Sequence, residues 1–109
     1  MAVPSVLLLS LIHIFSERPS PNFDARSGGV DMLILHYTGM KSADEALVRL
    51  TSPEARVSAH YLIDEDGSVI RLVAEDKRAW HAGVSSWRKR TDINGASIGI
   101  CLLYTSRCV

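Results

Sequence analysis

Two almost continuously apolar segments stand out along the chain. Val30 to Tyr37 (VDMLILHY) and Ser97 to Tyr104 (SIGICLLY) both have the length of a strand and contain very few polar positions. This pattern is typical of strands that are buried on both faces in the interior of a sheet. We therefore expect both segments to be central strands of one sheet.

The pattern between these strands predicts one helix. Ser42 and Glu45 form an S-x-x-E capping box, which commonly marks the first turn of a helix. An apolar stripe with helical spacing follows (Ala46, Leu47 and Leu50), and Pro53 ends it.

A hairpin is predicted next, from Ser58 to Ile63 (SAHYLI) and from Ser68 to Val73 (SVIRLV). Asp66-Gly67 between them supplies the positive φ that a tight turn requires. Ala74 to Arg90 shows no period, so we expect a long irregular segment there, and long loops in compact domains are usually functional.

Two further segments are predicted to be irregular. Glu17 to Gly29 is rich in Pro, Ser, Gly and charge and reads as a loop, and Asn94-Gly95 predicts a turn before the last strand.

The order of elements predicts an α/β domain with a mixed central β-sheet flanked by helices. No helix is expected after the last strand, which is predicted to run nearly to the end of the chain. We therefore expect the second face of the sheet to be uncovered and the domain to be incomplete at its C-terminus.

Composition narrows the class of protein. The chain has 109 residues, of which 47% are hydrophobic and 22% charged, as expected for one folded domain. Twelve Lys and Arg balance twelve Asp and Glu, so the chain lacks the basic surplus that nucleic-acid binding normally needs.

The apolar run from Val6 to Phe15 is too short to span a bilayer, so we predict no transmembrane segment. No Lys or Arg precedes it, and Ser-Glu-Arg follows it where a signal peptide would have a small-residue cleavage site. These features favour a cytoplasmic protein over a periplasmic or secreted one, and we expect a monomer. Cys101 and Cys108 have no metal-type spacing and say little about redox compartment.

Candidate chemistry centres on His36, His60 and His81. His36 closes an apolar strand, where the carboxyl edge of a sheet opens into a cleft, and neutral imidazole is the commonest side-chain metal ligand. A lone histidine is equally well explained as a hydrogen-bonded structural residue, and for His60 and His81 that interpretation is favoured. No H-E-x-x-H, phosphate-loop or G-x-S-x-G motif is present.

Aromatic residues in the irregular segment suggest a groove. Trp80 and Trp87 flank His81-Ala82-Gly83, where a glycine lets a ligand approach the backbone beside aromatic faces. Either tryptophan alone is more often a core residue that anchors a long loop.

Four strings, in this order and spacing, resemble the zinc N-acetylmuramoyl-L-alanine amidases of the amidase-2 group, whose fold is shared with peptidoglycan recognition proteins. They are LILHYTG (33–39), SAHYLIDEDGSV (58–69), RAWHAGVSSW (78–87) and DINGASIGI (92–100). The resemblance divides the chain into an apolar leader (1–16), an amidase-like portion (17–100) and a tail (101–109).

The resemblance implies a bacterial hydrolase of cell-wall turnover that cleaves the amide bond between N-acetylmuramic acid and L-alanine in peptidoglycan or muropeptides. It implies that His36 binds zinc, which activates a water and polarises the scissile carbonyl. Tyr37 and Thr38 are expected at the cleft wall, and Trp80 and His81 are expected to contact sugar or peptide. The position of His60 is interpreted as structural or cleft-lining.

The chain also departs from the family pattern. Cys101 stands where the family has its catalytic glutamate, so no catalytic residue is assigned, and a thiol is not an equivalent proton acceptor. The second zinc histidine and the zinc aspartate of the family have no counterpart here. We therefore expect zinc in a full-length parent, and we expect this chain to be an interrupted, inactive fragment of it. The alternatives are a non-catalytic muropeptide-binding module and an unfolded fragment.

Overall fold

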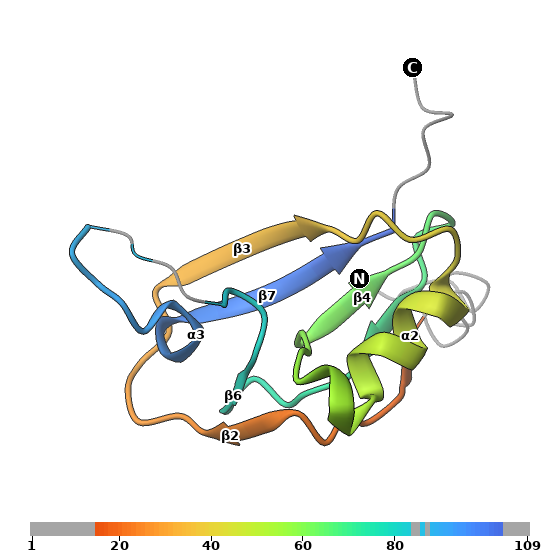
Figure 1. Cartoon of the computed structure of the whole chain (residues 1–109). Coiled ribbons are helices and arrows are strands. Elements are labelled where there is room, and N and C mark those ends of the chain that lie inside the picture. Colours follow the sequence, from red (N-terminus) through yellow and green to blue (C-terminus); the bar gives the residue numbers. More distant parts are fainter. Residues whose placement is uncertain (1–14, 84–85, 87, 104–109) are drawn as a thin grey trace, which may run out of the picture.

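The structure, a computed structural model, describes residues 15–83, 86 and 88–103 (Figure 1). Trp87, Cys108 and nearly all of the predicted leader lie outside these residues. Seven strands and three helices are present in the described part: β1 (Phe15–Glu17), β2 (Phe23–Ala25), β3 (Met32–Tyr37), α2 (Ala43–Thr51), the 3-10 helix η1 (Pro53–Ala55), β4 (Tyr61–Ile63), β5 (Val69–Arg71), β6 (Lys77–Ala79), α3 (Ile93–Ala96) and β7 (Ser97–Leu102).

The main sheet has five strands in the order β1-β5-β4-β7-β3. β3 and β4 both run parallel to β7, whereas β4 and β5 form the predicted antiparallel hairpin. The mixed sheet with helices confirms the predicted α/β class. β7 is interior, as expected, but the prediction that β3 is central is wrong, because β3 pairs only with β7 in the described part and lies at the edge.

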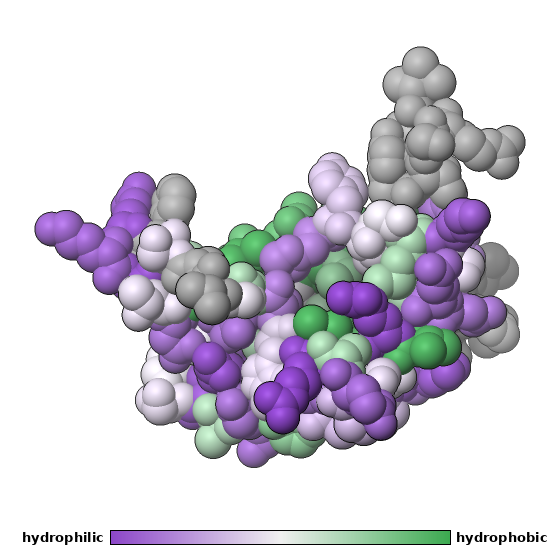
Figure 2. Space-filling view, viewed as in Figure 1, coloured by the Kyte–Doolittle hydropathy of each residue, from purple (hydrophilic) through white to green (hydrophobic). Residues whose placement is uncertain are grey.

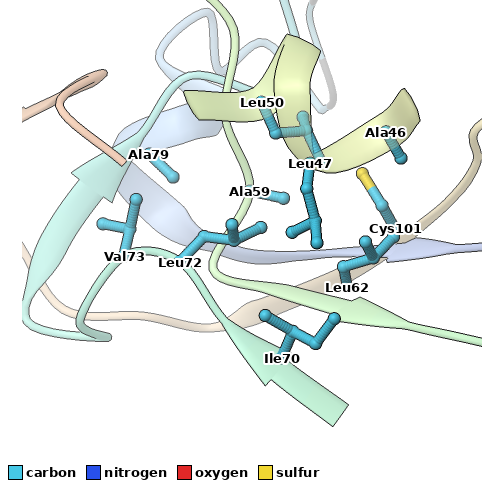
Figure 3. Packing of buried hydrophobic residues seen from close by; sticks show 10 residues of the cluster. All are labelled: Ala46, Leu47, Leu50, Ala59, Leu62, Ile70, Leu72, Val73, Ala79 and Cys101. Atoms are coloured by element: carbon cyan, nitrogen blue, oxygen red, sulfur yellow. The ribbon is translucent and has the colours of Figure 1, made fainter. Parts of the chain in front are cut away.

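Helix α2 forms as its sequence predicts and covers one face of the sheet. The Ser42 hydroxyl accepts a hydrogen bond from the Glu45 backbone N–H at 3.1 Å, and η1 begins at Pro53. The buried stripe of α2 packs against strand residues such as Leu62 and Cys101 (Figure 3). Burying a leucine of this kind stabilises the fold by roughly 1.5–3 kcal/mol.

The opposite face of the sheet carries apolar side chains that the described residues leave exposed. Leu33, Leu35 and Tyr37 of β3 are 63%, 57% and 72% exposed, so this face is open along β3 in the described part, whereas Ile98 of β7 is buried. Figure 2 shows apolar surface along the rim where β3 runs. β3 thus has apolar side chains on both faces, and for this reason its sequence resembles that of an interior strand. Only the face toward α2 is covered by the described residues.

Two segments predicted to be irregular contain short strands. β2 and β6 form an antiparallel pair in which Asp24 lies opposite Arg78, and their side chains form an ion pair at 3.0 Å. Their three-residue length gives no detectable alternation, so the predictions of loops at 17–29 and 74–90 are wrong at these positions. Asn94-Gly95 lies within α3 rather than in a turn. No helix among the described residues is long and apolar enough to cross a membrane.

Candidate functional site

The alternation of side chains along β3 decides which predicted residues can meet. The register pairs His36 with Cys101 of β7 and Ile34 with Gly99, and Cys101 belongs to the core beneath α2. Side chains of consecutive strand residues point to opposite faces. Tyr37 therefore lies on the other face of the sheet from His36, which separates it from the cleft wall where we expected it.

A small cavity of about 140 Å³ lies where β3 and β7 end beneath α2. Its lining residues are His36, Thr38, Met40, Arg49, Leu50, Val57, Ser58, Trp80, His81 and Cys101. Four of the five residues predicted for metal or substrate binding thus gather at one site, and only Tyr37 is absent from it.

Two larger cavities border the same residues. One of about 460 Å³ runs along β3 and is lined by His36, Leu33 and Ala82 among others. Another, of about 730 Å³, is lined by Trp80, Gly83 and Arg56 among others. Ligand sites of small molecules commonly enclose about 300–1,000 Å³, so the larger cavities have room for a sugar or peptide and the small one does not.

Hydrogen bonds join His36, His81 and Ser97 in a row. His36 Nε2 lies 2.9 Å from His81 Nδ1, and His81 Nε2 lies 3.0 Å from the Ser97 hydroxyl oxygen. The Ser97 hydroxyl also donates to the Ile93 carbonyl at 2.7 Å. The His81 ring rests directly on Gly99, where a Cβ atom would lie 2.6 Å from His81 Nδ1. Only glycine at position 99 leaves room for this ring.

The backbone of the segment around Trp80 is held by two side chains. The Ser58 hydroxyl accepts a hydrogen bond from the Trp80 backbone N–H at 2.9 Å. The Asn94 side-chain oxygen accepts from the backbone N–H groups of His81 and Ala82, at 3.0 and 2.8 Å. These contacts fix the indole and imidazole rings at the cavity although no regular element carries them.

His60 is a structural residue. It is fully buried, its Nδ1 accepts a hydrogen bond from the Gly99 N–H at 3.0 Å, and its Nε2 lies 2.9 Å from the Lys77 carbonyl. Because Nδ1 accepts, Nε2 carries the proton and donates to Lys77. The Arg26 guanidinium donates to the same carbonyl at 2.7 Å. Both ring nitrogens of His60 are therefore in use, which favours the structural interpretation over the cleft-lining one.

Burial keeps the ring nitrogens and the thiol uncharged at neutral pH. Desolvation lowers the pKa of His36, and desolvation together with the neighbouring His36 lowers the pKa of His81 to about 4. Desolvation raises the pKa of the Cys101 thiol to about 11. Cys101 is consequently an uncharged thiol packed in the core.

The described residues by themselves do not fit a zinc site. His36 Nε2 faces His81, both nitrogens of His60 are in use, and Cys101 is a protonated thiol. No three His, Cys, Asp or Glu side chains within the described ranges are grouped so as to hold a metal ion. His36 Nδ1 has no hydrogen-bond partner among the residues described, so this nitrogen alone remains available for a ligand.

Several residues of this site were not predicted from the sequence. Arg49 lies on the exposed side of α2 at the cavity rim, and Asn94 and Ser97 hold the rings in place. Arg49 immediately precedes Leu50, the last residue of the helical stripe, so its position beside Leu50 could have been predicted. The contacts of Asn94 and Ser97, in contrast, join segments that no local pattern connects.

Comparison with known proteins identifies relatives over most of the chain. Residues 26–107 match the family model of N-acetylmuramoyl-L-alanine amidase, Amidase_2. The chain is 39% identical over 101 residues to the 1,6-anhydro-N-acetylmuramyl-L-alanine amidase AmpD of Citrobacter freundii, an alignment that covers 75% of this chain and 54% of AmpD. It thus spans about half the length of this curated relative.

Solved structures agree with this result. A crystal structure of an AmpD derivative has a TM-score of 0.76 and 34% identity, covering 88% of this chain and 64% of that one. AmiD from E. coli, in complex with the substrate anhydro-N-acetylmuramic acid-L-Ala-D-gamma-Glu-L-Lys, has a TM-score of 0.59 and 36% identity, covering 79% and 34%. Because the family model matches most of the chain and these solved structures share its fold, the chain belongs to the N-acetylmuramoyl-L-alanine amidase family Amidase_2.

Proposed function

We propose that this chain supplies part of the catalytic site for hydrolysis of the amide bond between N-acetylmuramic acid and L-alanine, in peptidoglycan or in muropeptides. The observation that carries the proposal is His36, which lies near the end of β3 and lines both the 140 Å³ and the 460 Å³ cavity in a chain of the amidase family. The solved AmiD complex contains a muropeptide with this bond, which supports the same substrate class here.

We assign substrate binding to the side of the sheet that carries His36. Trp80 borders both the small cavity and the 730 Å³ cavity, so its indole is available to a sugar or peptide face. Thr38 and His81 line the small cavity beside it. Tyr37 lies on the opposite face of the sheet and is left out of this assignment.

Zinc belongs to the proposal as a cofactor that this chain holds only in part. His36 would provide one ligand through Nδ1, and the remaining ligands would come from outside the described residues. One ligand cannot retain zinc in a closed or catalytic site. We therefore expect the purified chain to bind muropeptide, to contain little zinc and to release little stem peptide.

The first experiment measures binding and turnover together. Purified chain is titrated with an anhydro-muropeptide, released peptide is followed by mass spectrometry, and zinc content is determined on the same sample. His36→Ala and Trp80→Ala should weaken binding, whereas Tyr37→Phe on the other face should not. A folded chain that neither binds nor cleaves the muropeptide would contradict the proposal.

A chimera then tests hydrolysis itself. Residues 17–100 are joined to the remaining C-terminal part of the C. freundii AmpD, and circular dichroism verifies that the product folds. We expect zinc uptake and peptide release that both disappear in His36→Ala. A folded, zinc-loaded chimera without turnover would show that the portion from this chain does not support catalysis.

A second candidate function is non-catalytic binding of muropeptides. The thiol of Cys101, where the family pattern has glutamate, and the absence of a three-ligand cluster from the described part both favour it. This candidate predicts saturable muropeptide binding that persists in the presence of a metal chelator and is never followed by hydrolysis, including in the chimera.

We also propose that the protein acts in the cytoplasm, on the basis of the features of residues 6–15 described above, and that it is a monomer. Fractionation of cells that express the natural gene tests the compartment. Analytical ultracentrifugation tests the oligomeric state.

A further inference from the structure

A row of hydrogen bonds runs from His36 through His81 and Ser97 to the Ile93 carbonyl. This carbonyl determines which group donates the proton in each contact. A backbone carbonyl only accepts, so the Ser97 hydroxyl must donate its proton to Ile93 in the 2.7 Å contact. The Ser97 oxygen is then an acceptor toward His81, and His81 Nε2 must carry the proton in the 3.0 Å contact. A neutral imidazole has one N–H, so His81 Nδ1 is left with a lone pair.

This assignment determines the state of His36. His81 Nδ1 can only accept in its 2.9 Å contact, so His36 Nε2 is the donor. His36 is then protonated on Nε2, and its lone pair lies on Nδ1, which has no hydrogen-bond partner among the described residues. The ring nitrogen that His36 presents to a ligand is thus decided by Ser97, two contacts away.

The His81 ring is rigidly placed for this task. Ser97 is fully buried at the start of β7, and the ring rests on the bare backbone of Gly99. Asn94 binds the backbone N–H of His81 itself at 3.0 Å. Three residues from α3 and β7 therefore fix the position and the direction of a ring that lies in an irregular segment.

We propose that His81 is a positioning residue for His36, holding it in the Nε2–H tautomer so that Nδ1 is its electron-pair donor. The sequence analysis expected His81 to contact substrate, and the hydrogen bonds give it this additional role. The inference rests on the proposed function in one respect, since it takes His36 as the residue through which the chain acts.

The test is nuclear magnetic resonance of the full chain labelled with ¹⁵N in histidine, at a pH where the rings are neutral. An N–H···N hydrogen bond gives a scalar coupling between the two nitrogens. We expect this coupling between His36 Nε2 and His81 Nδ1, with the bonded proton on His36. A proton found on His81 Nδ1, or a missing coupling in the folded chain, would overturn the proposal.

Three variants separate positioning from a merely structural contribution. His81→Asn places an amide oxygen near the position of Nδ1 and should keep the His36 Nε2 proton in slow exchange with water. His81→Gln reaches only the position of Nε2 and should lose that protection. Ser97→Ala frees His81 from its fixed direction, so the proton should become shared between both rings. Equal behaviour of the Asn and Gln variants would contradict the assignment.

His60 is the internal control in every spectrum. Its tautomer is fixed independently by the Gly99 N–H and the Lys77 carbonyl, so its resonances report whether the sheet is intact. Muropeptide binding is measured on the same samples. An intact row of hydrogen bonds with no muropeptide binding would refute the proposed function alone, whereas binding without the expected coupling would refute this inference alone.

Discussion

Replacing Gly99 with alanine should destabilise the protein and disconnect His36 from His81. A Cβ atom at position 99 would lie 2.5 Å from His81 Cδ2 and 2.6 Å from Nδ1, closer than the 3.0 Å below which real Cβ contacts essentially do not occur. The imidazole must therefore move away. The 2.9 Å contact between His36 and His81 would then lengthen, because Nδ1 is among the atoms displaced.

The size of the effect follows from opposing contributions. Overpacking of this kind costs about 1–3 kcal/mol, and the lost hydrogen bond costs about 1 kcal/mol more. Alanine recovers about 0.5–1 kcal/mol because it restricts the unfolded chain more than glycine does. We expect a net loss of about 1–3 kcal/mol in the free energy of unfolding. For a domain of this size, each kcal/mol lowers Tm by roughly 4–8 °C.

Urea unfolding followed by circular dichroism measures this loss, with Gly29→Ala as the matched control. An added Cβ at Gly29 meets no atom within 4 Å, and its φ is not positive, so that variant should be unchanged or slightly more stable. The penalty of Gly99→Ala should largely disappear in a His81→Ala background, since the nearest atoms all belong to His81. Equal stability of the two glycine variants, or a penalty that survives removal of His81, would refute the argument.

Three further predictions concern the groups that hold the site together. Arg26 donates to five backbone carbonyls in the segments 75–77 and 94–97. Arg26→Ala should therefore lower the free energy of unfolding, measured in urea, by at least about 3 kcal/mol, and Arg26→Lys should lower it by less. An unchanged urea midpoint would show that these contacts contribute nothing. Burial lowers the pKa of His60 and His81, the latter to about 4, so the unfolded chain binds more protons below the ordinary value of 6.5. Stability should be complete above 6.5 and decline as the pH falls toward 4, and a Tm that stays constant across this range would contradict the shifts. Burial raises the pKa of the Cys101 thiol to about 11, so this thiol should react slowly with a thiol reagent at neutral pH until urea unfolds the chain. The measurement uses a Cys108→Ser background. Rapid labelling of the native protein would be inconsistent with burial.

Local signals in the sequence predicted the elements that depend on neighbouring residues. Ser42 and Pro53 delimit α2 through contacts within a few positions, and Gly67, with φ of +89°, forms the hairpin turn. Such features are contained in a short window, so a single sequence is sufficient to find them.

The edge position of β3 could not be predicted in the same way. Leu33 and Leu35 are as apolar as residues of an interior strand, and only the pairing of β3 with β7 alone shows where the strand lies. The predicted site residues His36, Thr38, Trp80 and His81 line one cavity, and their roles stay a prediction. Tyr37 was predicted to lie with them, although it directly follows His36 in a strand and its side chain therefore points to the opposite face of the sheet.

The contacts that decide which ring nitrogen of each histidine carries the proton could not be predicted from local sequence patterns. His81 rests on Gly99 and is oriented by Ser97, although these two residues lie far from it along the sequence, beyond the four-residue helix α3. Nothing in a histidine that follows a tryptophan indicates which nitrogen carries its proton. That information exists only when the partners are placed in space.

The uncovered edge of the sheet has a practical consequence for the chain in solution. β3 offers one row of backbone groups without a strand partner in the described region, beside the exposed side chains of Leu33 and Leu35. Edges of this kind recruit further strands, so we expect association between molecules to compete with folding as the protein concentration rises. Solubility, the apparent unfolding midpoint and the yield of refolding should therefore all depend on dilution, and a charged residue at position 35 should relieve that dependence without touching the cavity beside His36.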